Sequence, residues 1–175
     1  MIAITIMAII TLVSYAPYNY YKKKMKLKNT ASQITQILYD ARNKAVNWTV
    51  WTNWNVSIGV YFNASTFENN QINMFSYPYN YDQNLISYIE NNDIKKIKTF
   101  KLEKWIQIDS IEWWNNLLFY FNAITWKVSY YKWNWAVRSD VLDDKININI
   151  SYKGSNSRNL NKEISYFTYT NVIDY

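Results

Sequence analysis

The sequence predicts an α+β fold in which one long N-terminal helix packs on an antiparallel β-sheet. The first sixteen residues carry no charged side chain, and an apolar stripe then runs from residue 27 to residue 45 in alternating steps of four and three. After Asn47 the apolar period changes to two, which is typical of half-buried antiparallel strands. We therefore expect one helix of about 45 residues, then about six to eight strands, without a second domain boundary.

The first part of the helix, residues 1–21, is predicted to cross a membrane or to form a filament core. A secretory signal peptide would have basic residues before its apolar run, whereas here the lysines follow it. The run is shorter than the about 20 apolar residues of a membrane span, so we expect a span clipped at its N terminus. Pro17 lacks a backbone N–H and is expected to kink the helix. The residues assigned to this segment are Ile2, Ile4, Ile6, Ile9, Ile10, Leu12, Val13 and Pro17.

Tyrosines and lysines directly after the apolar run predict a membrane interface. Tyrosine is typical of the interfacial belt, and a lysine near an anionic leaflet contributes about 1 kcal/mol. Nucleic acid is the alternative partner for such a basic and aromatic cluster, but the adjacent apolar run favours lipid. The positive-inside rule taken alone would place the following domain in the cytoplasm. The interface residues are Tyr20, Tyr21, Lys22, Lys23 and Lys24.

Residues 22–47 form the amphipathic half of the predicted helix. Its apolar stripe has small residues at every second position, which lets another helix or a sheet approach closely. The stripe either covers the protein's own sheet or packs against other subunits, and the two interpretations are compatible. It consists of Leu27, Ala31, Ile34, Leu38, Ala41 and Ala45.

Residues 48–175 are predicted to form a β-rich head. Alternation marks three strands, at Val56–Phe62, Leu117–Phe121 and Ile146–Tyr152. Further strands are expected at Lys104–Ile111 and Lys162–Thr170. Ala64–Asp93 is expected to be a long loop with a short strand near Ile72–Tyr77, and Ser155–Asn161 a hairpin loop between the last two strands.

Tryptophan stands where glycine is expected. The chain has 2 Gly and 9 Trp, and several tryptophans, such as Trp54, Trp126 and Trp133, lie between strand-like runs. Glycine is the usual residue at such turns, because a bulky side chain is poor at positive φ. We hypothesise that many of these tryptophans are UGA codons that a bacterial lineage reads as glycine; the alternative is an aromatic-rich protein with genuine tryptophans.

Composition argues against an enzyme. The chain has neither histidine nor cysteine, which excludes His-based triads, disulfides and thiolate metal sites. The carboxylates Asp109 with Glu112, and Asp140 with Asp143 and Asp144, are more typical of solvated loops than of catalytic or calcium sites. We therefore expect no cofactor, no metal and no small-molecule substrate. A weaker nucleic-acid candidate on the head is the group Lys95, Lys96, Lys98, Lys101 and Lys104.

The chain resembles the type IV pilin and type II secretion pseudopilin superfamily, and most closely its H-type minor pseudopilins. The segments that carry the resemblance are MIAITIMAIITLVSYAP, ASQITQILYDARNKAVNW, FNAITWKVSYY and the C-terminal ININISYKGSNSRNLNKEISYFTYTNVIDY. In the second of these, Ala41, Arg42, Ala45 and Val46 match the family's helix end, and Trp48 stands near its glycine. The family's basic leader and Gly-Phe-Thr-Leu-Ile-Glu motif are absent, so Met1 would fall inside the mature helix.

The resemblance implies a pilin-like fold and a structural function. The expected protein is a pilin or minor pseudopilin, anchored once in the inner membrane with its C-terminal domain outside the cytoplasm and assembled into a helical filament. Its partners would be other subunits, inner-membrane assembly proteins and lipid. The alternative is a single-span, membrane-anchored binding module, including a DNA-binding minor pilin.

Overall fold

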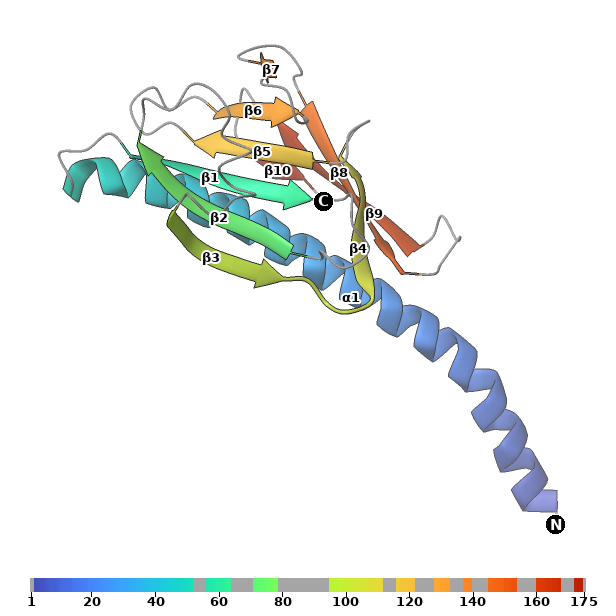
Figure 1. Cartoon of the computed structure of the whole chain (residues 1–175). Helices are drawn as coiled ribbons and strands as arrows, with labels where there is room; N and C mark the ends of the chain where they lie inside the picture. Colours follow the sequence, from blue (N-terminus) through green and yellow to red (C-terminus); the bar gives the residue numbers. More distant parts are fainter. Residues whose placement is uncertain are drawn as a thin grey trace.

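The computed structural model contains one long helix and two antiparallel sheets, so the α+β prediction is confirmed. It describes residues 2–51, 56–63, 71–78, 95–111, 116–121, 128–132, 137–139, 145–153, 160–167 and 172–174. The helix, α1 (Ile2–Trp51), is 50 residues long, and its N-terminal part extends away from the sheets (Figure 1). It continues through the expected head boundary at residue 48, and it includes Pro17. The kink expected at Pro17 stays a prediction.

Ten strands are described, more than the six to eight expected, and they form two sheets rather than one. Sheet A has the order β3-β2-β1-β5-β6-β7, and sheet B has the order β10-β9-β8-β4. The strands of sheet A are β1 (Val56–Asn63), β2 (Gln71–Pro78), β3 (Lys95–Lys101), β5 (Asn116–Phe121), β6 (Val128–Lys132) and β7 (Val137–Ser139). Those of sheet B are β4 (Ile106–Ile111), β8 (Lys145–Tyr152), β9 (Asn161–Phe167) and β10 (Val172–Asp174).

The pairing confirms some strand predictions and corrects others. The short strand expected near Ile72–Tyr77 is confirmed as β2, which pairs with both β1 and β3, while the rest of the predicted loop Ala64–Asp93 lies outside the described residues. The predicted hairpin loop Ser155–Asn161 also lies largely outside the described residues; β8 and β9 on either side of it pair directly, and β10 follows as a further strand. The strand expected from Lys104 begins at Ile106, because Lys104 and Trp105 form a turn closed by the Ile106 N–H donating to the Glu103 carbonyl at 2.9 Å.

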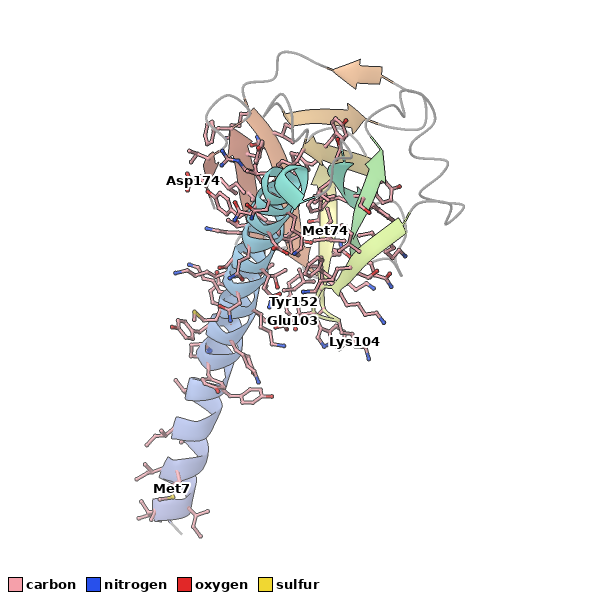
Figure 2. The ribbon with its side chains drawn as sticks, turned by 90° about the vertical axis from the view of Figure 1, so that its left-hand side faces the viewer. Met7, Met74, Glu103, Lys104, Tyr152 and Asp174 are labelled. Carbon is pink, nitrogen blue, oxygen red and sulfur yellow. The ribbon has the colours of Figure 1, made fainter. Side chains whose placement is uncertain are left out.

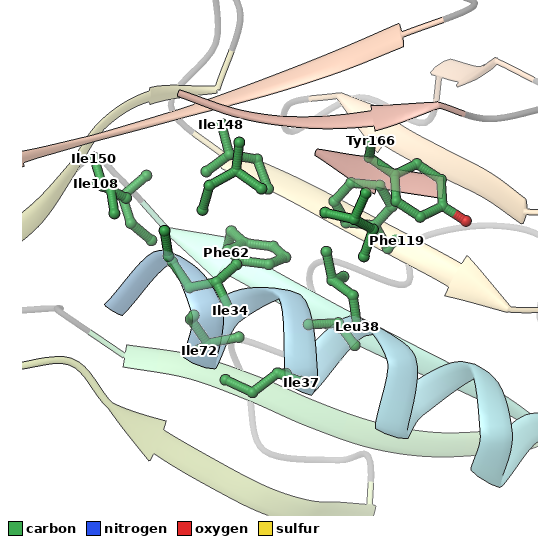
Figure 3. Packing of buried hydrophobic residues seen from close by; sticks show 14 of the residues in the cluster. Ile34, Ile37, Leu38, Phe62, Ile72, Ile108, Phe119, Ile148, Ile150 and Tyr166 are labelled. Atoms are coloured by element: carbon green, nitrogen blue, oxygen red, sulfur yellow. The ribbon is translucent and has the colours of Figure 1, made fainter. Parts of the chain in front are cut away.

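The core lies between the C-terminal half of α1 and both sheets. All six residues of the predicted helix stripe are buried, together with Ile37, and α1 contacts β1 and β5 of sheet A and β8 and β9 of sheet B. In Figure 3, Ile34 and Leu38 of the helix lie in one cluster with Phe62 of sheet A and Ile148 of sheet B, and Phe62 lies between Ile34 and Ile148. The stripe therefore covers the protein's own domain.

Aromatic side chains join the two sheets beside the helix. The ring of Phe119 on β5 meets the ring of Tyr166 on β9 edge to face, with centroids 5.1 Å apart, and meets Phe62 at 5.7 Å. Such pairs contribute about 0.5–1.5 kcal/mol beyond the area that they bury. β1 is buried on both faces, where we expected one solvated face: its Ser57 hydroxyl donates to the Tyr120 hydroxyl at 2.9 Å on the face away from α1.

Replacing Ile34 by alanine should lower the free energy of unfolding by about 2–5 kcal/mol, because the substitution leaves a cavity where α1 meets both sheets. Denaturant unfolding followed by circular dichroism measures this. The matched control is Gln36→Ala on the exposed face of the same helix, which should change stability by less than about 0.5 kcal/mol. Equal losses in the two variants would contradict the packing described here.

Stability should fall at alkaline pH because of Tyr166. Burial raises the pKa of its hydroxyl above the ordinary value of 10.0, despite the opposing charge of Arg42. The unfolded chain therefore releases this proton first, so the contribution is complete below pH 10 and is lost as the pH rises above it. Unfolding of wild type and Tyr166→Phe across this range should show a shallower decline for the variant. Parallel declines would contradict the assignment.

Candidate interaction surface

The N-terminal part of α1 presents large apolar side chains to its surroundings. Their exposed fractions range from 52% to 79%. Six of the residues predicted for the membrane span or filament core are among them, together with Met7, which was not in the predicted set. The side chain of Leu12 lies outside what the structure describes. The exposed apolar residues are Ile2, Ile4, Ile6, Met7, Ile9, Ile10 and Val13.

These side chains surround the helix instead of forming one stripe. Successive residues of an α-helix are about 100° apart, so positions 2, 4, 6, 7, 9, 10 and 13 point in most directions around the axis. A helix that is apolar all round is normally buried in a membrane or among other helices. Across the described part of the chain, however, no helix is both long enough and apolar enough to cross a membrane. The predicted span stays a prediction.

Tyrosines and lysines follow the apolar segment, as the sequence indicated. Tyr20 and Tyr21 are exposed, and so are Tyr15 and Tyr18 one to two turns earlier. Lys22 and Lys24 are exposed, whereas Lys23 is half-buried, with its Nζ 5.1 Å from the centroid of the Tyr152 ring. Pro17 is exposed on the helix surface. The head therefore begins to cover the helix near Lys23.

The head contacts the helix there through its β3–β4 turn and the end of β8. The Lys26 Nζ lies 2.7 Å from Glu103 Oε2, and this hydrogen bond and charge pairing raise the pKa of Lys26. The Lys153 N–H donates to the carbonyl of Trp105 at 2.6 Å, which holds the turn against the end of β8. Figure 2 shows Glu103, Lys104 and Tyr152 together at the end of the head nearest the N-terminal helix.

The sequence did not predict that these head residues contact the helix. Glu103 and Tyr152 belong to strands or turns far from Lys23 and Lys26 in the chain, and only the tertiary fold places them together. The one sequence signal is that Glu103 is the only acid among the surrounding lysines of residues 95–104.

A groove of about 670 Å³ lies between the outer face of α1 and β3. Its lining includes Gln33, Gln36 and Asn43 from the helix and Lys98 and Thr99 from the strand. Asp40 is the one carboxylate among the described lining residues, and its Oδ2 lies 2.6 Å from the Nζ of Lys44, so this lining includes no pair of carboxylates of the kind used in general acid–base catalysis. Lys98 extends over the Phe100 ring, 4.6 Å from its centroid.

The other sequence candidates are not assembled into a site. Among residues that the structure describes, no group of three or more His, Cys, Asp or Glu side chains is placed to hold a metal ion. Asp109 is exposed and accepts a hydrogen bond from Gln107 at 2.8 Å, while Glu112, Asp140, Asp143 and Asp144 lie outside the described residues. Of the lysines proposed for nucleic acid, Lys96, Lys98, Lys101 and Lys104 are exposed along β3 and the turn after it.

Comparison with known proteins adds no assignment. No protein-family model, no curated protein and no solved structure matches this chain.

Proposed function

We propose that this protein is a structural subunit of pilin or minor-pseudopilin type, held in the inner membrane and then assembled into a helical filament. The observation that carries the proposal is the division of one continuous helix into two halves with opposite surroundings. The C-terminal half is covered by the head, whereas the N-terminal half exposes apolar side chains in most directions around its axis. The exposed half would lie in the bilayer before assembly and among the helices of other copies afterwards.

Burial keeps the exposed half out of water in either surrounding. Full burial of one Ile, Val or Met side chain contributes about 1.5–3 kcal/mol relative to exposure to water. The gain summed over the exposed apolar residues of this half would hold the segment in the bilayer before assembly and among other helices afterwards. Because lipid tails are as apolar as these side chains, passage from the bilayer into the helix bundle would depend on close packing between helices.

Head shape and chemistry agree with a structural role. The described lining of the groove between α1 and β3 carries amide and lysine groups and one carboxylate, Asp40, which is paired with Lys44. The head buries the helix stripe against two sheets. A rigid head fixed to a protruding helix is suited to display around a central helix bundle. The alternative of a membrane-anchored binding module differs in one respect, since it would not polymerise.

Replacing Ile9 or Ile10 by aspartate should abolish membrane retention and filament entry while the head stays folded. A charge placed in the apolar segment costs about 2.5–3.5 kcal/mol at the centre of a bilayer. Membrane fractionation and lysine-reactive cross-linking into ladders measure the two properties, and circular dichroism follows the head. Ser32→Asp, exposed on the covered half of the same helix, is the control and should behave as wild type.

Two outcomes would contradict the proposal. Aspartate variants that still fractionate with membranes and filaments would show that this segment is not the assembly surface. Wild-type protein that is retained by membranes but gives no cross-linked ladder would favour the non-polymerising binding module.

A further inference from the structure

Three segments that are distant in sequence form one surface at the end of the head where the helix emerges. We define the basal surface as residues 22–28 of α1, residues 101–105 at the β3–β4 turn, and Tyr152 with Lys153 at the end of β8. The ion pair between Lys26 and Glu103 and the stacking of Lys23 on Tyr152 connect the helix to both head segments. Figure 2 shows Glu103 and Tyr152 near the helix at this end, with Lys104 further out on the same end of the head.

The basal surface is strongly basic. Eight lysines against the single acid Glu103 give it a formal charge of +7, more than the +6 of the whole chain. Glu103 is already paired with Lys26 at 2.7 Å, so it leaves most of this charge uncompensated. The lysines are exposed or half-buried. They are Lys22, Lys23, Lys24, Lys26, Lys28, Lys101, Lys104 and Lys153.

Chemical layers along the helix identify the kind of partner. Apolar side chains extend to Val13, exposed tyrosines follow from Tyr15 to Tyr21, and lysines begin at Lys22. At 1.5 Å per residue the tyrosine layer is about 9 Å deep, comparable with the polar interfacial region of a bilayer. A lipid leaflet presents acyl chains, an interface and anionic headgroups in this order. Nucleic acid would satisfy the lysines but not the two layers beneath them.

We propose that the basal surface, including Lys101 and Lys104 of the head, binds the headgroups of an anionic lipid leaflet. The inference rests on the proposed membrane residence of the subunit, but not on filament assembly. The head would then be held with this end toward the membrane by contacts additional to the helix anchor. The proposal rests on the lysines of the basal surface and does not use Trp105.

The basal surface is tested in a full-length variant whose N-terminal helix cannot insert into a membrane, so that vesicle binding depends on the basal surface alone. Ile9→Asp and Ile10→Asp together provide this background, and co-sedimentation compares vesicles of phosphatidylcholine with vesicles containing about one-third phosphatidylglycerol. We expect binding to the anionic vesicles only, weakening as salt increases. Adding Lys101→Gln and Lys104→Gln should weaken it roughly 25-fold, since each lysine contributes about 1 kcal/mol, or about fivefold, near an anionic leaflet.

The matched control removes two lysines elsewhere. Lys44→Gln and Lys145→Gln cause the same change in net charge, but Lys44 lies about 27 Å along the helix from Lys26 and Lys145 lies about 23 Å along β8 from Tyr152. Lys44 and Lys145 are exposed to a similar degree. Lys44 has the acidic neighbour Asp40, and Lys145 has the acidic neighbour Glu163. This control should bind anionic vesicles as the background does.

Three outcomes would overturn the inference, and a fourth would separate it from filament assembly. Equal loss in the control shows a dependence on net charge alone, and equal binding to both kinds of vesicle shows that charge is not used. Tighter binding to duplex DNA, measured by fluorescence anisotropy at the same salt, would assign the surface to nucleic acid. If wild type gives no cross-linked ladder while the basal lysines still bind anionic vesicles, filament assembly fails and the lipid inference stands.

Discussion

The structure depends on burial of the C-terminal half of α1 between two sheets. Leu27, Ile34 and Leu38 are nearly inaccessible, and they lie against side chains from both sheet A and sheet B. Alanines at positions 31, 41 and 45 are also fully buried, because small side chains let the strands approach the helix backbone closely. Each sheet needs a partner for its apolar face, and the helix supplies a partner to both.

The helix α1 also extends beyond the head, so burial of its covered half affects where its exposed half lies. The helix continues from Ile2 to Trp51, although Pro17 donates no backbone hydrogen bond, so the covered half sets the general direction in which the exposed half leaves the head. The ion pair of Lys26 with Glu103 and the contact of Lys23 with Tyr152 mark where coverage ends. A rigid connection between a packed head and an unpacked apolar helix explains why burial of the exposed half would also position the head.

Sequence patterns predicted the strands whose apolar residues alternate, and missed those with other compositions. β1, β5 and β8 follow the alternating runs closely. β3 has the sequence KKIKTFK and reads as a basic surface segment, yet its pairing with β2 places Phe100 opposite the buried Ile72. The three-residue strands β7 and β10 are too short for a period of two to be recognised. Their positions depend on backbone pairing with a neighbour that local sequence does not reveal.

The codon hypothesis stays a prediction, and the turn geometry agrees with it. Trp105 is the third residue of the turn closed by Ile106 and Glu103, and its side chain is half exposed. Six further tryptophans, at 54, 113, 114, 126, 133 and 135, lie between described elements. The third turn position is one that glycine often occupies, whereas a genuine tryptophan is more favourable in a strand.

The sequence by itself determined the long helix, its division into an all-apolar half and an amphipathic half, the basic cluster between them and the β-rich head. These features follow from periodicity and charge, which are local properties of the chain. Only the tertiary structure decided that the strands form two sheets, that both pack on the helix stripe, and that Glu103 and Tyr152 contact the helix lysines. These are contacts between residues far apart in sequence, and their free energy depends on the packing of the whole core.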